Sequence, residues 1–140
     1  MASVHLNKRV YDTRAGKKLA GSFIDRLGIK AGSTAATVKN LSGGNQQKVM
    51  LAKWLSLSPE LLIVNEPTHG VDVGAKADIY AILKSLTKEK KGILMISSEL
   101  PELLLLADRI VALYQGKIAG ILSKQEATEE KLAALVSGVA

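Results

Sequence analysis

The chain of 140 residues has no cysteine, three prolines and an aromatic content of only 4%. Without cysteine it can form no disulfide framework, no thiolate metal site and no thiol nucleophile. Its longest hydrophobic runs span about five residues, whereas a bilayer-spanning helix needs about 20. His5, Asn7 and Lys8 interrupt the first ten residues, so no signal-peptide core is expected there. We therefore expect no direct membrane insertion, and any membrane role would come through a partner.

The residues that are present favour a packed, soluble chain with a local excess of positive charge. Hydrophobic residues make up 47% of the sequence, which is too high for a disordered chain, and the length suits one domain or part of one. The net charge of +6 lies entirely in residues 1–40, because residues 41–140 carry equal numbers of acidic and basic side chains. Only Tyr11 and Phe23 could stack on bases in that basic segment. Nucleic-acid binding is therefore not expected.

The spacing of apolar residues predicts alternating helices and strands. Leu19, Phe23 and Leu27 recur at helical spacing, and Gly28 follows as a stop signal. Two short aliphatic runs, 61–64 and 93–96, are typical of strands buried on both faces of a parallel sheet. The pattern predicts helices at 17–27, 46–57, 75–86, 101–107 and after Thr128, a loop at 31–40, and a hairpin of 110–114 and 117–122. This alternation predicts an α/β layer with parallel central strands.

The stretch Leu41–Val49 is the first candidate binding site. Gly43 and Gly44 precede a predicted helix, and without side chains they allow close backbone approach. A helix start offers unpaired N–H groups and partial positive charge, which suit a phosphate, and Ser42 adds a hydroxyl donor. By itself the pattern fits a loop with a plain serine N-cap better.

The stretch Leu61–Pro67 is the second candidate. Four aliphatic residues run into Asn65 and Glu66, which places these side chains at the carboxyl end of a predicted parallel strand, where ligands bind in open sheets. Glu66 could there deprotonate a water as a general base. Taken alone, a solvated strand-to-turn transition explains the pattern better.

Taken together and in order, the motifs resemble those of ATP-binding cassette (ABC) ATPases. Leu41–Lys48 is similar to the family's signature motif, and Leu61–Pro67 to its Walker B strand with the catalytic glutamate. Further matches follow at the spacing of the family: the loop 68–72, the switch region 96–102, and the closing strand and hairpin at 107–111 and 115–117. Residues 45–48, 70–76 and 97–102 resemble the second cassette of tandem ATPases that drive ribose, xylose and galactose-type import.

The resemblance implies an incomplete P-loop NTPase layer of the α/β class, with parallel central strands and an N-terminal piece of the helical subdomain. Residues 1–40 would be a basic remnant of that subdomain, and residues 41–140 the C-terminal part of the ATPase domain, together one truncated domain. No Gly-x-x-x-x-Gly-Lys-Ser/Thr phosphate loop occurs; Gly16–Lys18 is the nearest stretch. We therefore expect the C-terminal half of a nucleotide-binding domain, inactive alone.

The resemblance also implies roles for individual residues. Glu66 would be the catalytic base. Asn65 stands where the family has a Mg²⁺-anchoring aspartate, so it would hold the metal only weakly. ATP and Mg²⁺ would be bound only in complex with an intact cassette. The residues implied in ATP binding are Ser42, Gly43, Gly44, Asn45, Asp72 and Ser98, the last standing where many relatives have a switch histidine.

The implied parent function is ATP hydrolysis that energises carbohydrate uptake. Its partners would be membrane permease subunits and a second ABC cassette, at the cytoplasmic face of the plasma membrane. Two alternatives stay open. One is a non-catalytic interaction module that docks on a transporter subunit or an intact cassette. The other is a piece of a DNA-repair-type ABC ATPase, although such proteins continue into heptad coiled coils, which are absent here.

Overall fold

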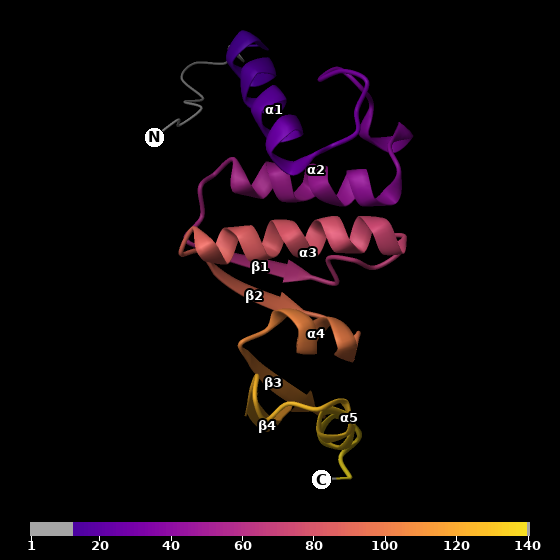
Figure 1. The fold of residues 1–140 in the computed structure, drawn as a ribbon, viewed down its shortest axis with the longest axis vertical. Helices are drawn as coiled ribbons and strands as arrows, with labels where there is room; N and C mark the ends of the chain where they lie inside the picture. Colours follow the sequence, from indigo (N-terminus) through magenta and orange to yellow (C-terminus); the bar gives the residue numbers. More distant parts are fainter. Residues whose placement is uncertain (1–12, 140) are drawn as a thin grey trace. The chain divides into compact units, whose positions relative to one another are not determined.

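A computed structural model describes residues 13–139 of the chain, and Figure 1 draws its helices and strands. The described residues form two compact units. Of the described residues, the first unit comprises 13–62 together with Pro67–Ile93, and the second comprises Ile63–Glu66 together with 94–139. The elements are α1 (Thr13–Leu27), the 3-10 helix η1 (Val38–Asn40), α2 (Gly43–Leu55), β1 (Leu61–Asn65), α3 (Val73–Lys88), β2 (Gly92–Ile96), α4 (Leu100–Leu106), β3 (Arg109–Tyr114), β4 (Lys117–Ser123) and α5 (Glu129–Ser137).

In the first unit, α2 is the central helix and contacts α1, η1 and α3 (Figure 1). Its buried face consists of Gly44, Lys48, Leu51 and Leu55, which recur at helical spacing. The facing stripe of α3 has the same period. Burial of these aliphatic side chains supplies the main stabilisation of the unit. The largest buried aliphatic residues of α2 and α3 are Leu51, Leu55, Ile79, Ile82, Leu83 and Leu86.

Strands β1 and β2 form a parallel two-stranded sheet. At the start of the two strands the Gly92 N–H donates to the Glu60 carbonyl, and at their end the Glu66 N–H donates to the Ile96 carbonyl. The start of β2 therefore lies beside the start of β1, and the end of β2 beside the end of β1, as parallel pairing requires. The predicted α/β class with parallel strands is confirmed.

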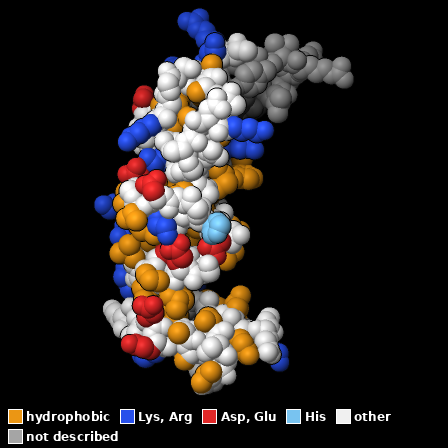
Figure 2. Space-filling view, turned by 90° about the vertical axis from the view of Figure 1, so that its right-hand side faces the viewer, with side chains coloured by type: hydrophobic (Ala, Val, Ile, Leu, Met, Phe, Trp, Pro, Cys, Tyr) orange, Lys and Arg blue, Asp and Glu red, His pale blue; other side chains and the backbone are white. Residues whose placement is uncertain are grey.

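The expectation that both strands are buried on two faces is wrong for this chain. Along β1, Leu62 and Val64 are buried, but Leu61 and Ile63 are 57% and 60% exposed. Leu94 and Ile96 of β2 are also about half exposed. All four side chains are thus exposed in the described part of the chain. Figure 2 shows hydrophobic side chains at several places on the face of the molecule that it draws. An aliphatic run shows that a strand can be buried on both faces, but only neighbouring elements decide whether it is.

The second unit is built on the antiparallel hairpin of β3 and β4, against which α5 packs. Ile110, Ala112 and Leu132 form its buried centre. The predicted turn at Gln115 and Gly116 is confirmed, because both residues have positive φ, as the tight turns of two-residue hairpins require. The predicted cap of α5 is also present, since the Thr128 hydroxyl accepts a hydrogen bond from the Lys131 N–H.

Other helix and loop boundaries differ from those that the sequence predicts. Helix α2 begins at Gly43, three residues before the expected start, because the Ser42 carbonyl already accepts the Gln46 N–H in the first helical bond. Helix α3 begins at Val73, directly after its cap Asp72. The loop expected at 31–40 ends in η1. No helix among the described residues is long and apolar enough to cross a membrane.

Candidate functional site

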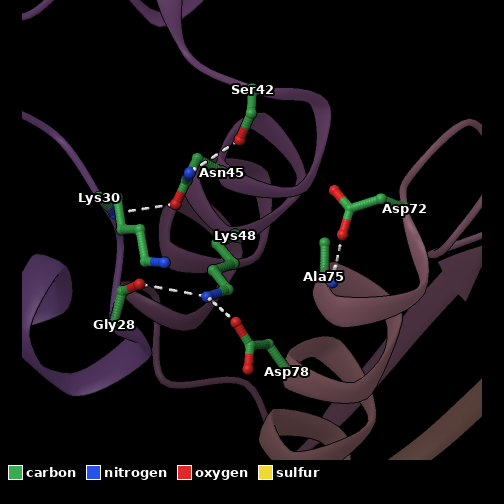
Figure 3. Close-up of polar contacts among 8 residues, drawn as sticks. All are labelled: Gly28, Lys30, Ser42, Asn45, Lys48, Asp72, Ala75 and Asp78. Carbon is green, nitrogen blue, oxygen red and sulfur yellow. Dashed lines mark hydrogen bonds and ion pairs between the residues drawn. The ribbon is translucent and has the colours of Figure 1, made fainter.

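The start of α2 is held by a short chain of hydrogen bonds (Figure 3). The side-chain amide of Asn45 donates from Nδ2 to the Ser42 hydroxyl at 2.8 Å. Its carbonyl oxygen accepts the backbone N–H of Lys30, also at 2.8 Å. Ser42 occupies the N-cap position, yet its side chain caps no backbone N–H. The plain serine cap therefore does not explain this residue, because its hydroxyl is fixed by Asn45 instead.

The two signature glycines pack against the segment that begins α3. A Cβ atom on Gly44 would overlap the Cβ atom of Ala75, and one on Gly43 would lie 3.3 Å from the Gly70 carbonyl oxygen. Gly44 is buried, and its lack of a side chain allows close contact between the two helices. The structure thus brings the first turns of α2 and α3 together within the first unit.

Asp72 fixes the start of α3. Its Oδ1 atom accepts the Ala75 N–H at 2.9 Å as the N-cap of that helix. The positive ends of both helix dipoles are therefore adjacent, and the N–H groups of the first turn of α2 precede its first intrahelical bond. Adjacent helix starts of this kind suit an anionic group such as a phosphate.

Lys48 is a structural residue of this site that the motif analysis did not single out. It is 5% exposed, and its Nζ atom lies 2.7 Å from Oδ2 of Asp78 and 3.1 Å from the Gly28 carbonyl (Figure 3). The hydrogen bond from Lys48 and the attraction of its charge hold the pKa of Asp78 below its ordinary value of 3.8. The signal was present in the sequence, because Lys48 falls on the same helical stripe as Leu51 and Leu55.

In the second unit, Glu66 and Ser98 are in direct contact. Glu66 follows β1 with φ of 47°, a left-handed conformation that residues with a Cβ rarely adopt. Its backbone N–H donates to the Ile96 carbonyl, and its Oε1 atom accepts the Ser98 N–H at 2.8 Å. Ser98 therefore contributes its backbone to this contact, while Asn65 is the exposed last residue of β1.

A second contact in this unit involves two residues that the sequence analysis did not choose. The Ser97 hydroxyl donates to Oε2 of Glu102 at 2.6 Å and accepts the Glu99 N–H at 3.1 Å. Glu102 is 2% exposed although it lies in the first turn of α4. A carboxylate in a first helical turn is usually solvated, so nothing in the local pattern marked it as buried.

Each unit thus collects part of the predicted set of residues. The first unit holds Ser42, Gly43, Gly44, Asn45 and Asp72, and the second holds Asn65, Glu66 and Ser98. Among the residues described, no group of three or more His, Asp or Glu side chains could hold a metal ion. An amide and one carboxylate at the end of β1 fit a Mg²⁺ ion only if phosphates and water supply the other ligands, which is the usual arrangement for that metal.

Comparison with known proteins supports the resemblance to ABC ATPases. Residues 3–69 match the model of the family described as ABC transporter. The fold of the described residues resembles a nucleotide-free ATP-binding cassette from an ABC transporter, with a TM-score of 0.77 at 19% identity over 91% of this chain and 53% of that one. A post-hydrolysis cassette dimer bound to ADP and Pi gives a TM-score of 0.72 at 21% identity, over 82% of this chain and 50% of that one. The chain therefore carries part of an ATP-binding cassette of the ABC transporter family.

The sequence is similar in particular to ribose import ATP-binding proteins. A protein of this name from Bacillus cereus is 54% identical over 122 residues, which are 87% of this chain and 25% of the relative. One from Lactococcus lactis subsp. cremoris is 47% identical over 129 residues, 92% of this chain and 26% of the relative. The chain spans about a quarter of the length of these curated relatives. The resemblance to the sugar-import type of cassette is confirmed.

Proposed function

We propose that this chain supplies the signature side of an ATP-binding cassette whose ATP hydrolysis energises monosaccharide uptake. The observation that supports this most is the contact of Gly44 with Ala75, which sets the first turns of α2 and α3 against each other. Two adjacent helix starts, one of them carrying the Ser42 hydroxyl, make a surface for the terminal phosphate of ATP. The similarity to ribose import ATP-binding proteins supports the class of cargo.

In this proposal a second cassette binds the nucleotide. The 140 residues contain no phosphate loop of the form Gly-x-x-x-x-Gly-Lys-Ser/Thr. The ATP would be held by the phosphate loop of a second cassette, and Ser42, Gly43 and Gly44 would close over its phosphates. Asn45 would position Ser42 through their 2.8 Å hydrogen bond. Asp72 would act through its cap of α3.

Glu66 is proposed to take the proton from the attacking water. Its Oε1 atom accepts the Ser98 N–H at 2.8 Å, which fixes the carboxylate at the end of β1. The other oxygen, Oε2, would then accept the proton. A bound Mg²⁺ would supply charge neutralisation at the phosphates, with Asn65 offering a neutral oxygen beside it. Because an amide carries no charge, this residue would hold the metal weakly.

The proposed partners are membrane permease subunits and a second cassette. The complex would lie at the cytoplasmic face of the plasma membrane, where the chain would be peripheral. These assignments rest on the similarity to importer ATP-binding proteins.

The test is a graft in which the phosphate-loop half of a cassette from the Bacillus cereus relative, 54% identical to this chain, is fused before residue 13. Release of phosphate from MgATP is measured for the graft, for its Glu66→Gln variant and for the 140-residue chain alone. We expect turnover only in the unsubstituted graft, because positioning of the triphosphate needs the phosphate loop and proton transfer needs the carboxylate. Turnover in the chain alone, above that of its own Glu66→Gln variant, would contradict the proposal.

A non-catalytic docking module is the second candidate, and one observation favours it. A cavity of about 460 Å³ lies in the first unit between α1, the segment 29–41 and α2. It is lined mainly by apolar side chains and is large enough for part of a partner helix. Its principal apolar residues are Leu19, Phe23, Ile24, Ile29, Val49 and Ala52.

Binding without turnover separates the two candidates. If the graft captures permease subunits but hydrolyses no ATP, and Phe23→Ser removes the capture, the docking module is the better description. If Glu66→Gln removes hydrolysis and Phe23→Ser leaves hydrolysis unchanged, the catalytic proposal holds.

A further inference from the structure

Glu102 is a buried carboxylate that the proposed mechanism does not use. It lies in the first turn of α4, is 2% exposed, and accepts the Ser97 hydroxyl at 2.6 Å. A buried carboxylate is costly unless polar groups compensate it, so its place beside Ser97 calls for a reason. The distance lies within the usual range for O–H···O⁻ hydrogen bonds, which are about twice as strong as neutral ones.

The Ser97–Glu102 contact lies one residue from the contact of Glu66. Ser97 follows β2 directly, and its hydroxyl both donates to Glu102 and accepts the Glu99 N–H at 3.1 Å. These two bonds fix the backbone on either side of Ser98. The Ser98 N–H points to Oε1 of Glu66 at 2.8 Å. All five residues belong to the second unit, so the bonds form one continuous series from α4 to the end of β1.

We infer that Ser97 and Glu102 are positioning residues that hold the Ser98 N–H on the carboxylate of Glu66. The inference rests on the proposed role of Glu66 as the base. Ser97 does not touch the reacting atoms; it restricts the conformations of the loop 97–99. A loop without this restriction would sample other conformations, and the Glu66 carboxylate would lose a fixed donor. Since catalysis depends on placing the base within hydrogen-bond reach of water, a small displacement would lower turnover.

The first experiment measures amide hydrogen exchange of the whole 140-residue chain by NMR, without nucleotide. In Ser97→Ala we expect the Ser98 amide to exchange about five- to tenfold faster, the factor that corresponds to the loss of one net hydrogen bond. Ser97→Thr keeps the hydroxyl and should restore slow exchange. When Glu66→Gln is the only substitution, it should change the chemical shift of the Ser98 amide proton. Combined with Ser97→Ala it should change that shift less, because the Ser97–Glu102 and Ser98–Glu66 hydrogen bonds are coupled.

Ser123→Ala is the matched control. The Ser123 hydroxyl donates to Glu126 at 2.6 Å in the same unit, so this variant removes a bond of the same chemistry and length away from the loop. It should leave the exchange of Ser98 unchanged. Unchanged exchange of Ser98 in Ser97→Ala would overturn the inference. So would faster exchange throughout β3 and β4, which would show a general structural role, and so would failure of Ser97→Thr to restore slow exchange.

The second experiment places the same variants in the active graft. Ser97→Ala should lower kcat by about tenfold to a hundredfold with little change in KM for ATP, and Ser97→Thr should recover most of kcat. A rise in KM with unchanged kcat would overturn the inference. If the graft shows no turnover at all, the proposed function fails, whereas the exchange result for Ser98 decides the positioning role on its own.

Discussion

The Nζ atom of Lys48 lies 2.7 Å from Oδ2 of Asp78, so a lysine on the buried face of α2 is joined to a carboxylate on α3. The lysine side chain is 6% exposed and the aspartate side chain 58% exposed. The ammonium also reaches the Gly28 carbonyl at 3.1 Å, just after α1 ends. One side chain thus links α1, α2 and α3, and it belongs to the helix whose first turn carries the signature residues.

Removal of Asp78, the exposed partner of Lys48, should destabilise the chain. Asp78→Ala leaves a buried ammonium with only a carbonyl, and we expect a loss of about 1–2 kcal/mol in the free energy of unfolding. That lies between the values for exposed and for fully buried ion pairs, because one partner here is solvated. Urea unfolding followed by circular dichroism measures it. Glu89→Ala is the control, since its 2.6 Å pair with Arg26 is exposed on both sides and should cost at most about 1 kcal/mol. Equal losses in both variants would contradict the account.

The same pair predicts a pH dependence. Hydrogen bonding from Lys48 and its charge lower the folded-state pKa of Asp78 below the ordinary value of 3.8. Its contribution is therefore complete above the unfolded-state pKa and is lost as the pH falls below that value. The difference in stability between the unsubstituted chain and Asp78→Ala should be constant from about pH 7 to about pH 5 and should shrink toward about pH 3. A difference that grows on acidification would have the wrong sign.

Gly44→Ala should destabilise the first unit although alanine is the better helix former. The added Cβ would overlap that of Ala75, and such overpacking costs about 1–3 kcal/mol. Ala75→Gly in the same chain should recover part of the loss. Gly21→Ala in α1 is the control, because nothing lies within 4 Å of its Cβ position, and it should stabilise by about 0.5–1 kcal/mol. The measurement is thermal unfolding of the unsubstituted chain, of Gly44→Ala with and without Ala75→Gly, and of Gly21→Ala. A stabilising effect of Gly44→Ala would refute the packing explanation.

Exposed aliphatic side chains should make the chain self-associate. Leu61 and Ile63 of β1 and Leu94 and Ile96 of β2 are each more than half exposed. Apolar surface on a short, uncovered pair of strands favours association between copies. Sedimentation velocity should show a concentration-dependent rise in mass, and Ile63→Lys should reduce it. The control Lys84→Met, on the exposed side of α3, should not. A monomer at all concentrations would contradict this expectation.

The order of helices and strands followed from the sequence because hydrophobic periodicity determines which faces pack. Where the hydrophobic pattern predicted the wrong boundary or burial, the outcome depended on tertiary contacts that the local sequence does not show. The start of α2 could not be read from periodicity, since Gly43 and Gly44 carry no apolar side chain to mark it. The prediction of two-sided burial failed for β1, since Leu61 and Ile63 are exposed in the described part of the chain.

Only some residues of the candidate site could be predicted, because the others depend on tertiary packing. Ser42, Glu66 and Ser98 belong to motifs whose spacing is visible in the sequence. Ser97 and Glu102 act through a hydrogen bond between a loop and a buried face of α4, and side-chain burial depends on tertiary packing. Lys48 could have been found, because a lysine on an aliphatic helical stripe is expected to be buried only if it has an acidic partner such as Asp78.

The Asn65 position tests the proposed metal contact. In the active graft, Asn65→Asp restores a negative charge beside the proposed metal, so the Mg²⁺ concentration for half-maximal ATPase should fall by about ten- to a hundredfold. Asn65→Ser, which adds no charge, is the control and should not lower it. An Mg²⁺ titration that Asn65→Asp leaves unchanged would mean that the metal is held elsewhere.

The most direct measurement of the central claim is ATP retention by the Glu66→Gln graft. If the start of α2 closes over ATP held by a second cassette, blocking proton transfer should leave nucleotide trapped in a dimer. Gel filtration after incubation with labelled ATP should show a dimer with bound nucleotide, and adding Ser42→Arg should abolish both dimer and label. Ser22→Arg in α1, whose serine hydroxyl donates to the neighbouring Leu19 carbonyl within that helix, should leave trapping intact. Retention of ATP by the Ser42→Arg variant equal to that of the Glu66→Gln graft would contradict the assignment of the signature surface.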